Sequence, residues 1–320
     1  MPVVILQSDN LRVGLFPQAG AGIVSFDGKF GDQWKPLMRP TPDQAVVSQD
    51  VSQFASFNLA PWSNRILNAS FNFAGQIYRL HANTPQGFAI HGDVRTRPWR
   101  VVEQTGQLLT CQLNSSEFAD INFPFPFTAD LRYELTNTAL TMTIALTNTG
   151  DGPMPAGFGF HPYFNRGFGA GGPDEVSIKF HATGIYSPVP GMAAAKVDGL
   201  ADSHRLPNSS FAPIPTSMDF SRLTSIGTQD IDHCYGGWNG RATIDYPSHD
   251  IQLHLQCDPV FSHVILYTPP GKPYFALEPV SHANDGFNLY AAGVPDTGVQ
   301  VLESDKKLYG SVRILVTPFV

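Results

Sequence analysis

Charged residues are scarce in this 320-residue sequence. Asp, Glu, Lys and Arg together make up 15% of the chain, against about 25% in average proteins. The net charge is −7, and no stretch gathers lysines and arginines. Because nucleic-acid phosphates are bound by clustered basic side chains, we do not expect a nucleic-acid partner. A small neutral ligand is compatible with this composition.

Cysteines and long apolar runs are also few. The three cysteines, Cys111, Cys234 and Cys257, are too few and too widely separated for a disulfide framework or a zinc ribbon. We therefore predict free thiols, which fit a reducing compartment. The opening stretch MPVVILQSDNLRVGLF lacks the basic segment and cleavage pattern of a signal peptide. No apolar run approaches the ~20 residues of a membrane span. The expectation is a cytoplasmic protein without a membrane partner.

Helical patterns are scarce as well, and an alternation of apolar and polar residues dominates the chain. Residues 140–148 alternate Leu, Met, Ile and Leu with threonines, and residues 251–257 alternate Ile, Leu, Leu and Cys with Gln and His. Residues 71–75, 131–135 and 175–180 repeat the pattern. Strict alternation predicts strands with one buried face and one wetter face.

Turn signals punctuate this alternation at close intervals, with 29 glycines and 27 prolines. Many short strands between such signals are typical of a sandwich or barrel. Residues 43–57 are the best candidate for a short helix or an irregular excursion. The loop-like stretches 169–175 and 208–220 do not divide the chain, because alternation resumes after each. We predict an all-β protein with one domain over residues 1–320, built from antiparallel sheets packed face to face.

Two polar segments in the first hundred residues break the alternation. In PWSNRI, Arg65 ends an aromatic-rich excursion from which it could point into a cleft. The plainer interpretation is an exposed arginine at a turn, since charged side chains are mostly exposed. In GFAIHGD, His91 precedes a glycine, which indicates a sharp turn. The alternative interpretation is a turn histidine that hydrogen-bonds to a neighbouring carbonyl.

Three later segments have a similar character. In GFGFHPYFN, the proline after His161 restricts that residue to extended backbone, so the imidazole is held in one direction. A packed aromatic turn is the alternative. In TQDIDHCYGG, Asp230 and Asp232 would share a strand face while His233 points the other way, unless the segment is a solvated loop. Glu278 ends the apolar run YFAL, and a buried carboxylate is costly without partners. That makes Glu278 the most suggestive of these residues.

Metal and cofactor motifs are not evident in the sequence. No pair of histidines has the spacing of a zinc site, and the sequence has no HExxH, phosphate loop or GxSxG. We therefore predict neither a metal nor a cofactor.

Taken in chain order, these segments resemble the aldose 1-epimerase (galactose mutarotase) family. The matching pieces are PWSNRI, GQIYRL, IHG, GFGFHPYFN, IDHCY and LEPVSHANDGFN, which run from about residue 58 to residue 288. Each piece alone is weak, but together and in this order they are specific. The resemblance implies the large β-sandwich of that family, the galactose mutarotase-like supersandwich. It also implies an isomerase that interconverts the α and β anomers of a free aldose such as galactose or glucose.

The resemblance further implies roles for individual residues. Glu278 matches the family's general base, and His161 matches its general acid. The remaining matches are sugar-binding residues, which are Arg65, His91, Asp232 and Asn64. Ring opening needs a base at the C1 hydroxyl and an acid at the ring oxygen, so a carboxylate and an imidazole suffice.

Two features around these residues leave the substrate open. Many family members carry a glutamine where this chain has Ile265, in ILYT, so a sugar contact is missing or supplied elsewhere. The rings of Trp62, Phe158, Phe160 and Tyr163 could stack on a pyranose, and several could equally be core.

Three other functions remain open from the sequence. A hexose-6-phosphate 1-epimerase would need cations for the phosphate, and Arg95, Arg97 and Arg100 are the candidates. A regulatory protein could bind a sugar without turnover. A glycoside hydrolase could use Asp232 and Glu278 as its carboxylate pair. The expected partner is a small-molecule monosaccharide substrate, and the oligomeric state, monomer or homodimer, is left open.

Overall fold

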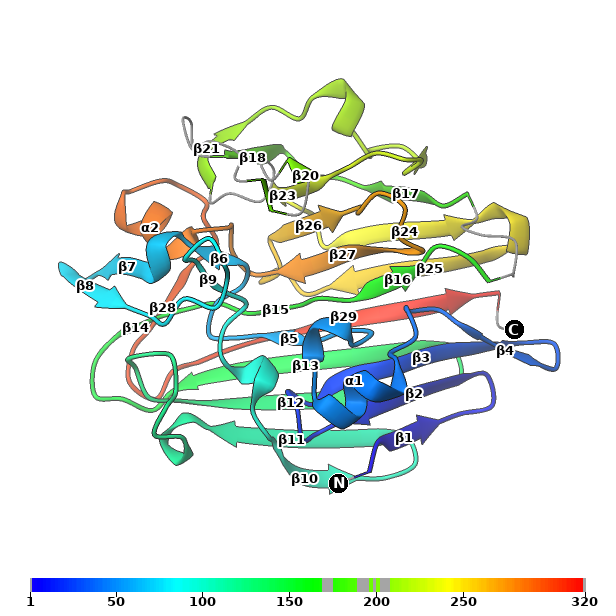
Figure 1. Ribbon diagram of the computed structural model, residues 1–320, viewed down its shortest axis with the longest axis horizontal. Coiled ribbons are helices and arrows are strands. Elements are labelled where there is room, and N and C mark those ends of the chain that lie inside the picture. The colour runs from blue at the N-terminus through cyan, green and yellow to red at the C-terminus, as the bar shows by residue number, and fades with distance from the viewer. Residues whose placement is uncertain (1, 169–174, 189–195, 198–199, 202–207, 319–320) are drawn as a thin grey trace.

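Antiparallel strands form two large sheets in the computed structural model, which describes residues 2–168, 175–188, 196–197, 200–201 and 208–318. Strands run across the view of Figure 1 from β10 at the bottom to β21 at the top. In spatial order, the nine-stranded sheet consists of β10 (Arg100–Gln104), β11 (Leu108–Asn114), β12 (Phe127–Leu135), β13 (Ala139–Asn148), β29 (Lys307–Thr317), β25 (Ile251–Cys257), β24 (Arg241–Tyr246), β17 (Ser177–Phe180) and β22 (Thr224–Ser225).

The eight-stranded sheet carries the candidate site. Its spatial order is β21 (Asn208–Ala212), β18 (Gly184–Pro188), β23 (Asp232–Gly236), β26 (His263–Tyr267), β27 (Tyr274–Val280), β15 (Gly159–Phe160) and β5 (Asn58–Leu59), and β16 (Tyr163–Asn165) also pairs with β27. All of its strand pairs are antiparallel. The all-β prediction is therefore confirmed.

Smaller elements surround the two large sheets. The four-stranded sheet is β1 (Val4–Gln7), β2 (Leu11–Phe16), β3 (Gly22–Phe30) and β4 (Gln33–Pro36). The two-stranded ladders are β6 (Arg65–Ile66) with β9 (Ala89–Ile90), β7 (Ser70–Phe73) with β8 (Gln76–Arg79), β14 (Met154–Ala156) with β28 (Gln300–Leu302), and β19 (Lys196–Val197) with β20 (Leu200–Ala201). The α-helices of the described chain are α1 (Asp43–Ser48) and α2 (Gly286–Ala291).

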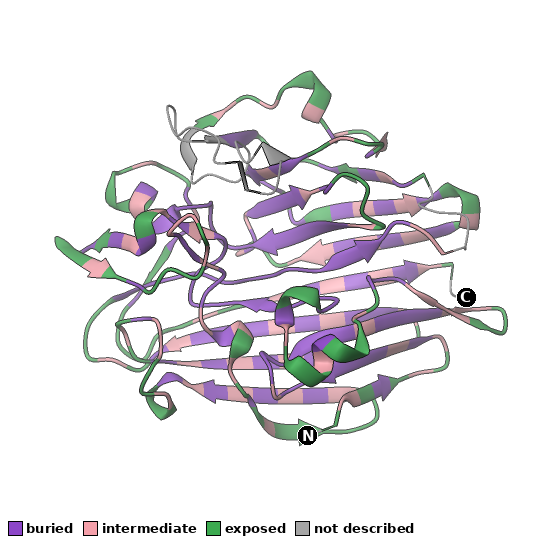
Figure 2. Cartoon of the chain, in the orientation of Figure 1, coloured by how far each residue is buried: buried purple, intermediate pink, exposed green. Residues whose placement is uncertain are grey.

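The predicted alternation appears as strands with one buried face. β13 and β25 cover the two longest alternating stretches, and β12 covers residues 131–135. Buried and partly exposed residues alternate along the long strands in Figure 2. The stretch 43–57 holds α1 and a 3₁₀ turn, Val51–Gln53, in agreement with the expected short helix or irregular excursion.

One face of each large sheet contributes to a shared apolar core. Val264 and Leu266 of β26 lie in one buried cluster with Leu253 of β25 and Val312 of β29. Neighbouring residues on a strand point to opposite faces, so Ile265 points away from that core. The candidate site lies on this second face of the eight-stranded sheet.

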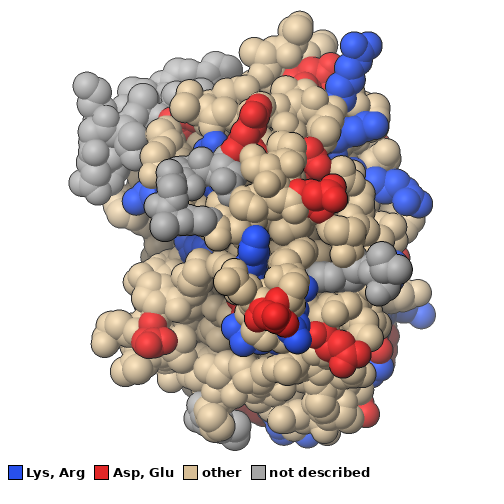
Figure 3. All heavy atoms as spheres, turned by 90° about the vertical axis from the view of Figure 1, so that its right-hand side faces the viewer, with Lys and Arg blue, Asp and Glu red and all other residues tan. Residues whose placement is uncertain are grey.

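Cysteines and surface charges complete the description. Cys111, Cys234 and Cys257 are free thiols, as predicted. In the described part of the chain, no helix is long and apolar enough to cross a membrane. On the face seen in Figure 3, lysines and arginines lie among aspartates and glutamates.

Candidate active site

The six residues singled out in the sequence line one cavity of about 170 Å³. They arrive from five separate segments of the chain. The complete lining of the cavity is Asn64, Arg65, His91, His161, Tyr163, Asp232, Tyr267 and Glu278. The segments far apart in sequence therefore meet on the outer face of the eight-stranded sheet.

Strand register explains why His161 meets Glu278. Tyr163 of β16 lies opposite Ala276 of β27, and β15 continues the same register on the other side of His161. Continuation of this register places His161 opposite Glu278. Their side chains are in contact, with 3.1 Å between His161 Nε2 and Glu278 Oε1. Both residues are almost completely buried.

The neighbouring row of the sheet supplies the next part of the lining. Asp232 of β23 lies opposite Tyr267 of β26, which in turn lies opposite Ala276. Asp232 and Tyr267 thus share the face that carries Glu278, one row further along the strands. This row therefore presents an aromatic ring and a carboxylate to the cavity.

Arg65 begins β6, and Asn64 and His91 lie immediately beside the β6–β9 ladder. The side-chain oxygen of Asn64 accepts hydrogen bonds from Arg65 N at 2.9 Å and Arg65 Nη1 at 3.1 Å. His91 N donates to Asn64 O at 2.9 Å. Arg65 Nη2 lies 3.9 Å from Asp232 Oδ2, so an ion pair links Arg65 to β23 of the eight-stranded sheet. Arg65 is therefore held at the cavity by fixed partners on two sides.

Glycines allow two of these segments to approach their neighbours. Gly92, next to His91, has φ +68°, and a Cβ there would lie 1.9 Å from Ala60 O. Gly157 precedes the His161 segment, and a Cβ there would lie 1.9 Å from the ring of His282. No other residue fits either position without displacing its neighbour.

Aromatic rings and arginines pack around His161. The rings of Phe57 and Tyr163 each lie 4.5 Å from the imidazole, centroid to centroid. The guanidinium carbon of Arg39 lies 3.4 Å from the centroid of the Tyr163 ring, and Arg39 Nε donates to Phe54 O at 2.9 Å. The imidazole is thus fixed by packing, with a buried cation in contact with Tyr163.

Burial shifts the pKa values of the central pair in opposite directions. Burial, and next the charge of Asp232, raise the pKa of Glu278 well above its usual value. Burial, and next the charge of Arg39, lower the pKa of His161 well below its usual value. Burial, and next the interaction with His161, lower the pKa of His91. Burial thus favours the uncharged form of each group, a protonated carboxyl and a neutral imidazole.

Three residues that line the cavity have a buried polar atom without a hydrogen-bond partner. Within the described chain, Glu278 Oε2, His161 Nδ1 and His91 Nδ1 are buried and have no hydrogen-bond partner. Buried polar groups are normally bonded. A ligand with several hydroxyl groups would supply partners that the protein itself does not.

The raised pKa of Glu278 predicts a pH-dependent stability change in Glu278→Gln. Above about pH 4.5 the unfolded chain ionises Glu278, while the raised pKa in the folded protein delays that ionisation to higher pH. The free energy of unfolding therefore falls as pH rises toward the folded pKa. The glutamine cannot ionise, so the variant should be more stable than wild type at pH 7–8, by about 1.4 kcal/mol per unit of pKa difference. Urea unfolding at several pH values measures this.

Glu303→Gln, at an exposed glutamate, is the matched control and should show no such gain. The advantage of Glu278→Gln should disappear near pH 4. Equal stability of Glu278→Gln and wild type at every pH would contradict the raised pKa.

Several aromatic and cationic candidates lie outside the cavity. Trp62, Phe158 and Phe160 are fully buried in the main core, and Tyr163 alone of the four proposed rings lines the cavity. Arg97 is paired with Asp93 and Asp120, and Arg100 bonds to Gln112. Arg95 lies over the ring of Phe57, with its guanidinium carbon 5.5 Å from the ring centroid. Among the described lining residues, Arg65 is the one cation.

The structure places two residues of β26, Ile265 and Tyr267, at or next to the cavity. Ile265 lies opposite Glu278 but is fully buried in an apolar cluster with Tyr163 and Cys234, so it provides no polar contact. The sequence analysis did not predict that Tyr267 lines the cavity. Its position two residues after Ile265 could have indicated this, because alternate residues of a strand share a face.

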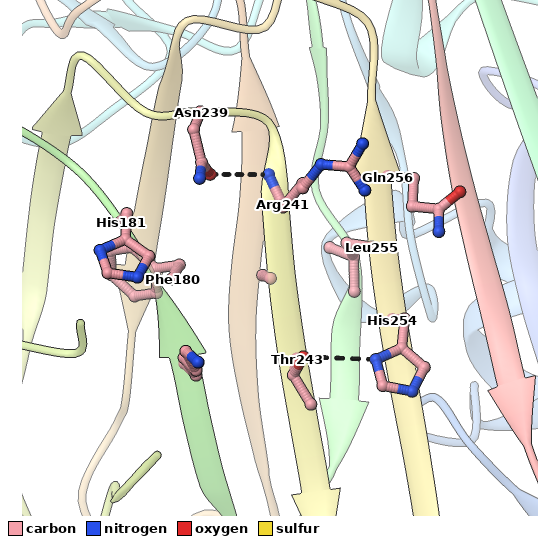
Figure 4. A pocket seen from close by; sticks show the side chains of 10 residues that line it. Phe180, His181, Asn239, Arg241, Thr243, His254, Leu255 and Gln256 are labelled. Carbon is pink, nitrogen blue, oxygen red and sulfur yellow. Dashed lines mark hydrogen bonds between the residues drawn. The ribbon is translucent and has the colours of Figure 1, made fainter. Parts of the chain in front are cut away.

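A larger hollow lies on the outer face of the nine-stranded sheet (Figure 4). Thr243 of β24 and His254 of β25 are bonded across it at 3.3 Å, and Arg241 lies at its exposed end. Its volume is about 320 Å³. Its polar lining is what the solvent-facing side of an antiparallel sheet normally presents. None of the predicted site residues lies there.

Comparisons with known proteins point to one family. A family model described as aldose 1-epimerase matches residues 2–309. The uncharacterized protein YphB of Escherichia coli is 26% identical over 293 residues, covering 89% of this chain and 90% of YphB. The aldose 1-epimerase of the same organism is 29% identical over 126 residues, 37% of this chain and 34% of that enzyme.

Solved structures share the fold at low sequence identity. A putative aldose 1-epimerase from E. coli superposes with a TM-score of 0.81 at 21% identity, covering 99% of both chains. A galactose mutarotase-like protein from Clostridium acetobutylicum has a TM-score of 0.81 at 16% identity, covering 98% of this chain and 95% of its own. The predicted mutarotase-like architecture is confirmed by these similarities.

Proposed function

The chain belongs to the aldose 1-epimerase family, and we propose that it interconverts the α and β anomers of a neutral free hexose such as galactose or glucose. The observation that carries the proposal is the buried pair of Glu278 and His161, 3.1 Å apart at the wall of a polar cavity. An acid and a base side by side match the anomeric centre, where the C1 hydroxyl and the ring oxygen share one carbon.

Ring opening moves one proton to the sugar and one from it. A proton first moves from Glu278 to His161 across 3.1 Å, which leaves a carboxylate and an imidazolium. Glu278 then takes the proton of the C1 hydroxyl while His161 donates one to the ring oxygen. The bond between C1 and the ring oxygen breaks, and an open-chain aldehyde forms. The pair is left as a protonated carboxyl and a neutral imidazole, which burial favours. Rotation about C1–C2 and the reverse transfers close the ring as the other anomer.

The other lining residues would bind and orient the sugar. Asp232 accepts hydrogen bonds from two hydroxyls, and Tyr163 and Tyr267 offer ring faces to the pyranose. Arg65 stabilises negative charge that develops near the ring oxygen. Because Arg65 is within 3.9 Å of Asp232, the lining carries no surplus cation for a phosphate. A neutral sugar is therefore favoured over a hexose 6-phosphate.

Polarimetry with freshly dissolved α-D-galactose and α-D-glucose tests the proposal. The protein should speed the change in rotation above the buffer rate, and glucose 6-phosphate should not be preferred. A panel of neutral aldoses without any acceleration would refute it. Binding without acceleration would instead indicate a regulatory protein, and release of nitrophenol from nitrophenyl glycosides would indicate a hydrolase.

Arg39 provides a pH-dependent prediction for this mechanism. Its charge, after burial, lowers the pKa of His161. Arg39→Gln removes the charge, so His161 should be protonated more easily and the acidic limb of the kcat/KM profile should move to higher pH. Arg39→Lys keeps the charge and should leave that limb close to wild type. Identical acidic limbs in Arg39→Gln and wild type would contradict the role of Arg39.

A further inference from the structure

A second cavity, of about 870 Å³, lies on the same face of the eight-stranded sheet as the candidate active site. His263 lines the second cavity and Tyr267 the first. The two residues are four apart on β26, so their side chains share one face of the sheet, roughly 13 Å apart along the strand.

A closed apolar row separates the two cavities. Cys234 of β23 and Ile265 of β26 lie opposite each other between them, and both are buried. Leu289 and Ala283 belong to the same apolar cluster and are buried as well. The second cavity is therefore a separate site rather than an extension of the first.

An exposed aromatic ring rests on the sheet inside the second cavity. Gly184 of β18 lies opposite Gly236 of β23. A Cβ on Gly184 would lie 2.4 Å from Phe211 Cζ, and one on Gly236 would lie 2.8 Å from Phe211 Cε2. The ring of Phe211 fits against the strands because these two residues are glycines. The side chain is nonetheless 46% exposed, so it offers a supported apolar surface to the cavity.

A fixed hydrogen-bond chain forms the floor beside this ring. Tyr186 OH is 3.1 Å from His263 Nε2 and donates to Asp296 O at 3.1 Å. Ser262 Oγ is 2.8 Å from His263 Nδ1. The rings of Tyr186 and Phe211 lie 5.1 Å apart. The aromatic surface is therefore built before any ligand arrives.

The remaining walls combine a second exposed ring with polar groups. Tyr290, in α2, is 43% exposed. Asp296, Thr297 and Gln300 supply a carboxylate, a hydroxyl and an amide. Among the described residues of this lining there is no lysine or arginine. Anionic ligands would lack a partner charge, whereas aromatic faces with hydroxyl, amide and carboxylate groups suit a pyranose.

We propose that this cavity is a second, non-catalytic saccharide site, with a pyranose ring on Phe211 and a second sugar unit toward Tyr290. The volume is in the range of cavities that hold drug-sized ligands, which a disaccharide matches. The proposal does not require turnover at Glu278 and stands apart from the proposed function.

Saturation-transfer NMR with cellobiose, maltose and lactose at millimolar concentration tests the proposal. Wild type should transfer magnetisation to at least one of these disaccharides. Arg65→Ala combined with Asp232→Ala, in the first cavity, should keep that transfer. Phe211→Ala combined with Tyr290→Ala should weaken binding by about 2- to 10-fold for each ring removed. It should leave the rate of anomer interconversion unchanged. Tyr309→Ala, at a 66% exposed tyrosine of the nine-stranded sheet, is the matched control and should bind as wild type does.

The second site would be overturned if wild type transferred magnetisation to none of the three disaccharides. It would also be overturned if transfer persisted unchanged in the variant that combines Phe211→Ala with Tyr290→Ala. Loss of transfer only in the variant that combines Arg65→Ala with Asp232→Ala would overturn it as well. Tyr290→Ala alone, at an exposed position, keeps the test available if the double variant does not fold. Disaccharide binding by a protein that fails to speed mutarotation would refute the proposed function and leave this site standing.

Discussion

Replacing Glu278 with glutamine is expected to lower the rate of anomer interconversion at least ~100-fold, and so is replacing His161 with asparagine. Glu278→Gln keeps the size of the side chain, and His161→Asn keeps a polar side chain, but each removes one proton-transfer group from a pair 3.1 Å apart. The remaining group cannot do both transfers, because opening the ring requires a proton to leave one oxygen while another arrives at its neighbour. Rates from polarimetry on purified variants measure the loss.

Matched controls separate this loss from general damage. Glu303→Gln and His254→Asn make the same chemical changes at an exposed glutamate and at a histidine of the nine-stranded sheet. Both should retain the wild-type rate. If Glu278→Gln or His161→Asn also retains it, that residue has no proton-transfer role.

Arg65→Gln is expected to lower kcat by about 10²- to 10³-fold, the usual loss when a donor to a developing oxyanion is removed. Removing the charge of Arg65 should lower kcat in a second way. That charge opposes the rise in the pKa of Glu278. Without it, Glu278 holds its proton more tightly, and less of the carboxylate that starts the reaction is present.

Arg65→Lys distinguishes charge from geometry at this position. Lysine keeps the positive charge but cannot bond to Asn64 as the guanidinium does at 3.1 Å. The kcat of Arg65→Lys should lie between those of wild type and Arg65→Gln. Steady-state kcat and KM, measured separately, show whether the loss is in turnover. An unchanged kcat in Arg65→Gln would contradict the role proposed for Arg65.

The strands were largely predictable from the sequence because their burial follows a period of two. Residues 251–257 alternate in sequence and form β25 with those bounds. The same rule separates the rings of GFGFHPYFN. His161 and Tyr163, two apart, line the cavity, while Phe158, Phe160 and Phe164 lie in the core. The sequence therefore contained the signal for Tyr163, although the proline after His161 interrupts the strand between β15 and β16.

The surroundings of the pair were not predictable in the same way. Arg39 and Phe57 reach His161 through tertiary packing, and nothing in their local sequence indicates it. The pKa shifts likewise depend on burial by segments far away in the chain. Five of the six predicted site residues were singled out by segments that break the alternation, whereas Asn64 and all of the roles came from the family resemblance. The structure brings the six residues to one cavity. The roles given to them remain predictions.

Exchange NMR at equilibrium tests the central claim most directly. Exchange between the α and β anomeric signals of galactose and glucose is slow in buffer, and wild-type protein should accelerate it without changing the ratio of the anomers. Glu278→Gln, at the same concentration, should leave exchange close to the buffer rate. Wild-type protein that exchanges neither sugar faster than buffer, or Glu278→Gln that exchanges them as fast as wild type, would contradict acid–base catalysis by Glu278 and His161.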